Sequence, residues 1–293
     1  MIKKINCPAL INFTLYERDY ILSKFNIDDN LIGEEVKEGF RCFLVLFNSK
    51  TYLYNNETQE DVIERFPHLK ANINNSIILD GFLFDKAPEY VYSMVRINVD
   101  MAIKRQEKKK VKFYAMDCIK INNESITDLP LFQRKVILNE VVAKINNEHI
   151  KGVKISKHKE EFYNNLNANN GSGMLYKDIN SLYNDNVKYK KRACKHIIKA
   201  KILKINKEIS SLEYGLLEKG RIINHGQASA RKSTIVKMLK ENPESLLNKF
   251  VTLHYQYVTV KNKLRNARII EILDQETIIT NVEDLYFIKK GGI

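Results

Sequence analysis

The sequence has no hydrophobic run long enough to cross a bilayer. Its longest uninterrupted apolar stretch is Cys42 to Phe47, whereas a membrane-spanning helix needs about 20 apolar residues. The first residues, Met1 to Asn6, are basic, but the apolar core of a signal peptide does not follow them. We therefore expect neither membrane insertion nor secretion, and we expect the protein to act in the cytoplasm.

Cysteine is scarce and scattered. There is no Cys-x-x-Cys motif and no Cys/His pairing with the spacing of a zinc site, so neither a structural metal nor a disulfide framework is indicated. Free thiols in a reducing compartment are the expected state. The four cysteines are Cys7, Cys42, Cys118 and Cys194.

Negative charge is also in short supply. The 293 residues include 48 Lys and Arg against 35 Asp and Glu, which gives a net charge of +13 and a pI near 9.3. Such an excess suits a polyanionic partner such as nucleic acid; the alternative is a coding bias toward Lys, Asn and Ile. Hydrophobic residues make up 44% and charged residues 28%, which is typical of a globular chain with one large or two ordinary domains.

The first 200 residues are expected to form short strands and two helices. The expected strands are residues 41–47, 51–54, 77–79, 111–121 and 174–176. The expected turns are Asn48-Ser49-Lys50, Asp80-Gly81, Asn122-Asn123 and the stretch 164–173. One helix is expected over Tyr90–Lys104, with a solvated basic tail that runs to Lys112. The other follows Pro130, where apolar residues recur at spacings of three and four, at Leu138, Val141, Val142 and Ile145.

The last 90 residues favour a small β-barrel. Residues 195–205, 214–223 and 251–260 are strand-like, and Val251, Leu253 and Tyr255 alternate with polar residues. One helix is expected over Ser233–Glu241, before Pro243. Several short strands interrupted by one helix are typical of an OB barrel, and we place the domain boundary between Lys201 and Glu208.

Segments along both halves form a recognisable series. In the first half they are Glu34–Arg41, Asn75–Leu83, Phe113–Ile119, Asp128–Arg134, Gly173–Lys177, Tyr183 and the basic stretch near Lys195. In the second half they are Gly226–Ser229, Asn242–Val251, Tyr257–Thr259 and Leu264–Arg268. Their order and intervals, over about residues 10 to 285, resemble the ATP-dependent DNA ligases. The resemblance implies an α+β nucleotidyltransferase (adenylation) domain with antiparallel sheets, residues 1–204, followed by a C-terminal OB-fold barrel, residues 205–293.

The resemblance also implies a chemistry that this chain departs from. In the family a lysine attacks the α-phosphate of ATP and forms lysyl-AMP, within a motif Lys-x-Asp-Gly-x-Arg. Gly39 and Arg41 match that motif and Glu38 replaces its Asp, but Val36 stands at the lysine position. Lys37 is adjacent, and on a strand its side chain would point to the opposite face. A local slip or bulge would be needed for Lys37 to act as the nucleophile.

Further family residues are replaced. The family's Asp-Gly-Glu reads Asp80-Gly81-Phe82 here, its Glu-Gly reads Ser172-Gly173, and the second lysine of its later basic motif falls on Ile197. Those carboxylates usually contact the ribose or hold the divalent metal. The sequence therefore leaves the metal ligands unknown.

The resemblance assigns candidate site residues to two groups. The nucleotide-side residues are Glu35, Arg41, Arg96, Lys177 and Lys195, with Lys37 as the catalytic candidate only if the motif is shifted. The DNA-side residues of the barrel are Arg231, Lys232, Lys237, Lys261, Lys263, Arg265 and Arg268. Each functional assignment has a structural alternative. Arg41 and Asp117 would merely pair within the fold, and the basic residues of the barrel would merely form a solvated surface.

Three functions are compatible with these observations. The first is a ligase-like protein that binds duplex or nicked DNA, is inactive or impaired because of Val36, and serves phage or plasmid DNA replication or maintenance. The second is an active ligase that seals nicks with Lys37 as nucleophile and uses ATP and Mg²⁺, cofactors that the inactive form would not require. The third is a non-enzymatic scaffold that binds protein partners, which the sequence does not identify.

Overall fold

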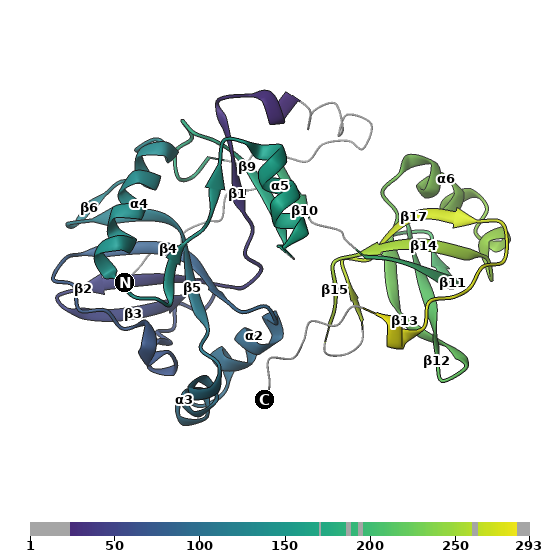
Figure 1. Cartoon of the computed structure of the whole chain (residues 1–293), viewed down its shortest axis with the longest axis horizontal. Coiled ribbons are helices and arrows are strands. Elements are labelled where there is room, and N and C mark those ends of the chain that lie inside the picture. Colours follow the sequence, from purple (N-terminus) through teal and green to yellow (C-terminus); the bar gives the residue numbers. More distant parts are fainter. Residues whose placement is uncertain (1–23, 170, 186–188, 193–195, 260–262, 286–293) are drawn as a thin grey trace. The chain divides into compact units, whose positions relative to one another are not determined.

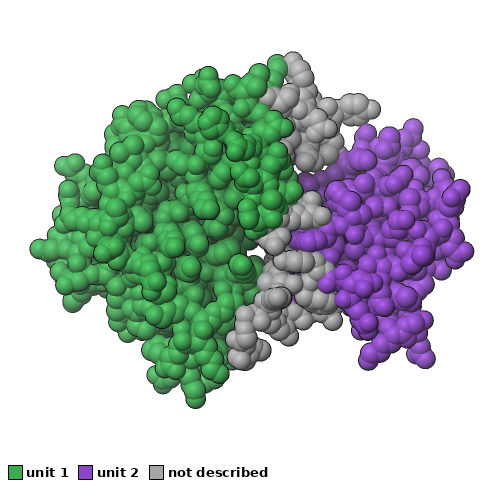
Figure 2. All heavy atoms as spheres, in the orientation of Figure 1, with its two compact units in different colours: residues 1–12, 20–192, 291–293 green, residues 13–19, 193–290 purple. Residues whose placement is uncertain are grey.

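The computed structural model describes residues 24–169, 171–185, 189–192, 196–259 and 263–285 (Figure 1). These residues form two compact units, one within residues 24–192 and the other within 196–285 (Figure 2). The expected boundary at residues 204 and 205 falls inside β11 (His196–Asn206), which belongs to the second unit. No helix in the described part of the chain is both long and apolar enough to span a membrane.

The first unit is built on a six-stranded sheet in which β7 pairs in parallel with β5 and the other neighbours are antiparallel. Its strands are β2 (Phe40–Phe47), β3 (Lys50–Asn55), β4 (Ile77–Phe84), β5 (Lys112–Ile121), β6 (Glu124–Ser125) and β7 (Ile150–Gly152). Period-two alternation buries Leu44, Leu79 and Phe113 in the main core. The predicted hairpin at Asn48-Ser49 is confirmed, and both residues have positive φ, as tight hairpin turns require.

The predicted turn at Asp80-Gly81 is wrong, because β4 runs straight through both residues. A bulge in the pairing of β4 with β5 lies there instead. A Cβ on Gly81 would lie 2.3 Å from the carbonyl oxygen of Tyr114. The glycine therefore permits a close approach of β5 rather than a change of direction.

The helices of the first unit differ in part from the prediction. The single helix expected over Tyr90–Lys104 is two, α2 (Pro88–Arg96) and α3 (Val99–Lys108), since Asn98 caps a new helix by accepting a hydrogen bond from the Met101 N–H at 2.9 Å. The basic tail is therefore partly helical. The helix after Pro130 is confirmed as α4 (Leu131–Ile145).

The first part of the stretch expected to be turn-rich, 164–173, is the second half of α5 (Lys159–Ala168). This helix covers a four-stranded antiparallel sheet in the order β10-β9-β1-β8. Its strands are β1 (Leu31–Glu35), β8 (Ile155–Ser156), β9 (Gly173–Asp178) and β10 (Tyr189–Arg192). Gly33 packs closely against Met174 and Phe162 on the α5 side. Successive strand residues face opposite sides, so Glu34 points away from α5.

The second unit is a closed five-stranded barrel in the order β11-β12-β13-β17-β14. The strands after β11 are β12 (Ser211–Glu218), β13 (Arg221–Ser229), β14 (Phe250–Tyr255) and β17 (Arg268–Leu273). The single strand expected over 214–223 is two, because Lys219-Gly220 turns the chain with positive φ at both residues. The predicted helix is confirmed as α6 (Ser233–Glu241), between β13 and β14. This arrangement confirms the OB fold, and a short hairpin, β15 (Tyr257–Val258) and β16 (Leu264–Arg265), follows β14.

Candidate functional site

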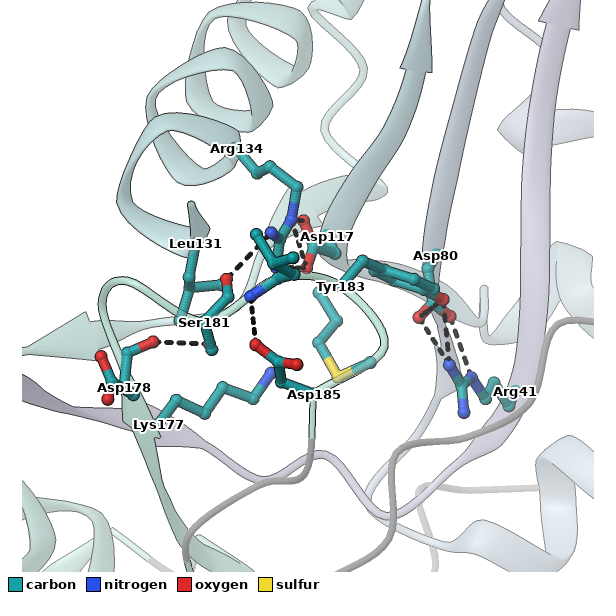
Figure 3. A pocket seen from close by; sticks show the side chains of 12 residues that line it. Arg41, Asp80, Asp117, Leu131, Arg134, Lys177, Asp178, Ser181, Tyr183 and Asp185 are labelled. Carbon is teal, nitrogen blue, oxygen red and sulfur yellow. Dashed lines mark hydrogen bonds and ion pairs between the residues drawn. The ribbon is translucent and has the colours of Figure 1, made fainter. Parts of the chain in front are cut away.

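A pocket opens in the first unit beside β4, β5 and the segment that follows β9 (Figure 3). It holds about 400 Å³ of empty space, part of which is open solvent. Both ionic and apolar side chains line it: Arg41, Asp80, Met116, Asp117, Leu131, Arg134, Lys177, Asp178, Ser181, Leu182, Tyr183 and Asp185. The predicted candidates Arg41 and Lys177 therefore share one pocket.

Arg41 is engaged by Asp80 and Tyr183. Its Nε and Nη2 donate to the two carboxylate oxygens of Asp80 at 2.9 and 2.7 Å, and Nη2 lies 3.3 Å from the Tyr183 hydroxyl. Burial acts to lower the pKa of Arg41, but Asp80 raises it, and the net pKa is above the ordinary value. Burial also raises the pKa of Tyr183, so its hydroxyl stays protonated and donates to Asp80 at 2.8 Å. The guanidinium is thus neutralised inside the pocket.

Asp117 and Arg134 form a second buried pair. Arg134 Nε and Nη2 reach the two carboxylate oxygens of Asp117 at 3.0 and 3.1 Å. Nη1 of Arg134 also donates to the carbonyl oxygen of Ser181 at 3.1 Å and to that of Leu129. These contacts tie α4 to β5 and to the segment after β9. Asp117 therefore holds the fold together, which is one of the alternatives considered above.

Lys177, which lines the pocket, shares one buried carboxylate with a second lysine. Glu34 is fully buried, with Lys177 Nζ 2.6 Å from Oε1 and Lys135 Nζ in contact with Oε2. Burial acts to raise the pKa of Glu34, but the two ammonium groups outweigh it and the pKa is lower than usual. Sequence reasoning missed Glu34 and Lys135. The structure shows that the strand carrying Glu34 is buried along its whole length. A buried charge needs a partner, so the charge of Glu34 was the signal that could have indicated one.

Val36 and Lys37 diverge after β1. Val36 is 7% exposed, and its N–H donates to the carbonyl oxygen of Gly173 at 3.0 Å. The Lys37 ammonium instead contacts the Glu35 carboxylate and lies 4.9 and 4.5 Å from the ring centroids of Phe84 and Tyr114. None of Val36, Lys37 and Glu35 lines the pocket of Arg41 and Lys177.

The other nucleotide-side candidates lie elsewhere. Arg96 is exposed in the last turn of α2, where its guanidinium lies 5.9 Å from the Tyr92 ring, and it does not line the pocket. Lys195 lies outside the described residues. Of the predicted nucleotide-side set, the structure brings together Arg41 and Lys177.

The DNA-side candidates fall on two parts of the barrel unit. Arg268 lies opposite His254 in the pairing of β14 with β17. Burial first, and then the charges of Arg268 and Lys232, lower the pKa of His254. Exposed candidates accompany them near α6, namely Arg231 and Lys237. The β15–β16 hairpin carries Lys263 and Arg265, both exposed. Lys261 lies outside the described residues.

The carboxylates of the pocket do not fit a divalent metal. Asp80 is held by Arg41 and Tyr183, and Asp117 by Arg134. Asp178 and Asp185 accept hydrogen bonds from backbone N–H groups at 2.8 and 2.6 Å. Among the described residues no three His, Cys, Asp or Glu side chains gather as a metal site would require.

Known proteins resemble the chain in sequence pattern and in fold. A family model described as "ATP dependent DNA ligase domain" matches residues 20–201. A solved structure of Lig E DNA ligases, described as "DNA binding with a minimal scaffold", is 17% identical with a TM-score of 0.59, and the match covers 92% of this chain and 100% of that one. A second, named Pmar-Lig_PreS3, is 12% identical with a TM-score of 0.60, and the match covers 90% and 67%. No curated protein sequence matches significantly. At these identities the structures establish the fold.

Proposed function

Because the chain belongs to the ATP-dependent DNA ligase family, we propose that it binds nicked or duplex DNA but has lost the ability to adenylate itself. The observation that carries this proposal is Val36 at the position of the family's nucleophilic lysine. In that reaction a lysine nitrogen forms a bond to the α-phosphorus of ATP while pyrophosphate leaves. The isopropyl side chain of Val36 has no lone pair with which to form that bond.

The position of Lys37 argues against its use as a substitute nucleophile. Its ammonium contacts Glu35 and lies over two aromatic rings, and these attractions hold the nitrogen in place. An attacking lysine nitrogen must instead be aligned with the phosphate. To act, Lys37 would have to leave both contacts.

The remaining charges of the pocket support the same proposal. Half-buried Phe82 and Ser172 stand where the family carries glutamates, which removes two potential contacts to ribose or metal. Arg41 and Arg134 each have their own aspartate. ATP and Mg²⁺, on which the family depends, would therefore meet a pocket whose two arginines are already paired with aspartates.

DNA binding needs none of these catalytic groups, because cationic side chains alone can contact phosphates. The exposed Arg231, Lys237, Lys263 and Arg265 of the barrel unit are suited to such contacts. We assign this protein to the replication or maintenance of phage or plasmid DNA as part of the same proposal.

The decisive test measures transfer of label from α-labelled ATP to the protein, with Mg²⁺ or Mn²⁺, beside an active ligase. We expect no labelled band for the wild type, for Val36→Leu or for Lys37→Ala. A labelled wild type whose label is lost in Lys37→Ala would establish the active-ligase alternative and refute inactivation. In parallel, fluorescence anisotropy should detect binding to a nicked duplex that weakens as salt rises. Absence of binding at low salt would refute the DNA-binding function and favour the scaffold.

A further inference from the structure

The basic segment Lys104–Lys112 is not explained by the pocket or by the barrel. Its first part lies in α3, which leads into β5 (Figure 1). Lys109 is neutralised there, because its ammonium lies 2.7 Å from Asp85 and 5.3 Å from the Tyr90 ring centroid. Lys110 is exposed and Lys112 is half-buried beyond the helix end. Neither the pocket nor the barrel assigns a role to Lys110 and Lys112.

A third lysine joins them from a distant part of the chain. Strand β7 pairs in parallel with β5 so that Lys151 lies opposite Tyr114, and the Phe113 N–H donates to the carbonyl oxygen of His149 at 2.8 Å. Lys151 is exposed. Lys110 and Lys112 come just before Phe113, and Lys151 follows Ile150, the residue opposite Phe113, so the three lysines lie around the start of this pairing. Burial lowers the pKa of His149 there, Glu148 acts to raise it, and the charges of the three lysines lower it further. We call Lys110, Lys112 and Lys151 the lysine patch.

The backbone beneath the lysine patch is fixed by hydrogen bonds. A ring nitrogen of His68 lies 2.8 Å from the carbonyl oxygen of Val111. The Asn147 side chain donates to the carbonyl oxygen of His68 at 2.9 Å and accepts from the N–H of His149 at 2.9 Å. The elements that carry the three lysines are thus held together, while the long side chains can adapt to a partner.

The acidic side chains near the lysine patch do not neutralise its three ammonium groups. Within the described ranges, no carboxylate lies within ion-pair distance of Lys110, Lys112 or Lys151. One acid near the patch is Glu148, whose side chain is 83% exposed and lies 3.3 Å from His149. Three cations on one surface without paired carboxylates attract a polyanion.

We propose that the lysine patch is a DNA-contacting surface of the first unit, in addition to the basic residues of the barrel, and that it binds phosphates of a duplex backbone. This inference rests on the proposed DNA-binding function. The flexible side chains of two exposed lysines and one half-buried lysine suit a row of phosphates, since each cation can meet a separate phosphate and release its counterions. An enclosed small anion would instead need a walled cavity with converging donors.

The test is a salt titration of binding to a fluorescent duplex of about 30 base pairs. The patch variant carries Lys110→Gln, Lys112→Gln and Lys151→Gln. The matched control carries Lys50→Gln, Lys120→Gln and Lys157→Gln and has the same net charge. Lys50 and Lys120 lie at the opposite end of the six-stranded sheet. A third protein carries Arg231→Gln, Lys232→Gln and Arg268→Gln in the barrel. Circular dichroism melting curves verify that all are folded.

We expect the patch variant to bind about tenfold or more weakly at about 0.1 M salt, and its slope of log K against log salt to shrink by about 2.7, or about 0.9 for each lost phosphate contact. The control should keep the wild-type slope. Acetylation of the wild type, read by mass spectrometry, should show that DNA protects the three patch lysines and leaves Lys50 reactive.

Two results would refute the role of the lysine patch but not DNA binding itself. One is a wild-type salt slope in the patch variant. The other is an equal loss of affinity in the matched control, which would mean that only net charge matters. In either case, weaker duplex binding by the barrel variant would still support the DNA-binding function. A wild type that does not bind the duplex at low salt would instead refute the DNA-binding function itself, and the patch with it.

Discussion

Removing the carboxylate of Glu34 should destabilise the first unit strongly. Glu34 is fully buried, and the Lys135 side chain is 5% exposed. Glu34→Gln keeps the size of the side chain but leaves two ammonium groups without a counter-charge. Removal of one partner from a buried ion pair costs about 3–5 kcal/mol, so we expect the free energy of unfolding to fall by that amount.

A matched variant separates the loss of charge balance from the loss of a contact. Lys177→Met removes one ammonium group but leaves Glu34 paired with Lys135, so one charge of each sign remains. We therefore expect Lys177→Met to cost clearly less than Glu34→Gln, although both remove the same 2.6 Å contact.

Urea unfolding followed by circular dichroism is the appropriate assay, because the chain has no tryptophan. With an m-value of about 2 kcal/mol/M, the midpoint of Glu34→Gln should fall by about 1.5–2.5 M. The reasoning is refuted if Glu34→Gln costs less than about 1 kcal/mol, the range of an exposed pair, or if Lys177→Met costs as much. Acid gives a second readout: the lowered pKa of Glu34 means that its contribution is present above its ordinary pKa of 4.5 and is lost as pH falls below it.

Three further outcomes follow from the geometry. Tyr183→Phe removes the donor to Asp80 and should lower the free energy of unfolding by about 1–3 kcal/mol, because a buried acceptor loses a partner; urea unfolding measures it. Burial lowers the pKa of His68, so the unfolded state binds its proton first as pH falls below 6.5, and stability should decline there in the wild type but less in His68→Gln. Gly33→Ala should cost about 1–3 kcal/mol by overpacking, because its Cβ would lie 2.3 Å from Met174 Sδ, and a drop in melting temperature would report it.

Local pattern predicts those elements of this fold whose residues carry their own signal. The helix Ser233–Glu241 is bounded as expected. The alternation from Val251 to Tyr255 predicts β14, which ends at Tyr255, short of the expected end at residue 260. The wrong predictions lie where packing against distant parts of the chain outweighs the local pattern. Helix α5 is rich in asparagine, which favours turns, yet Leu166 and Phe162 anchor it on the four-stranded sheet. Gly81 reads locally as a turn, but the close approach of β5 gives it another role.

The candidate site was harder to predict, because its contacts join residues that are distant in the chain. Arg41 and Lys177 were identified through the family motifs, and both line the pocket. The ion pairs and hydrogen bonds around them were not predicted, since Tyr183 reaches Asp80 across 103 residues and Lys135 reaches Glu34 across 101. No local spacing encodes such pairs. A charged residue in a buried strand indicates that a partner exists, but not which residue it is.

These partners change how the substitutions should be interpreted. Under the proposed function, Val36 removes a nucleophile, which leaves open whether the pocket still attracts a nucleotide. The ion pairs show that Arg41 is already neutralised by Asp80, and that Lys177 shares Glu34 with Lys135. A phosphate would have to compete with these carboxylates for the same cations. The internally paired cations therefore support the proposed loss of self-adenylation, and we infer that these ion pairs stabilise the fold.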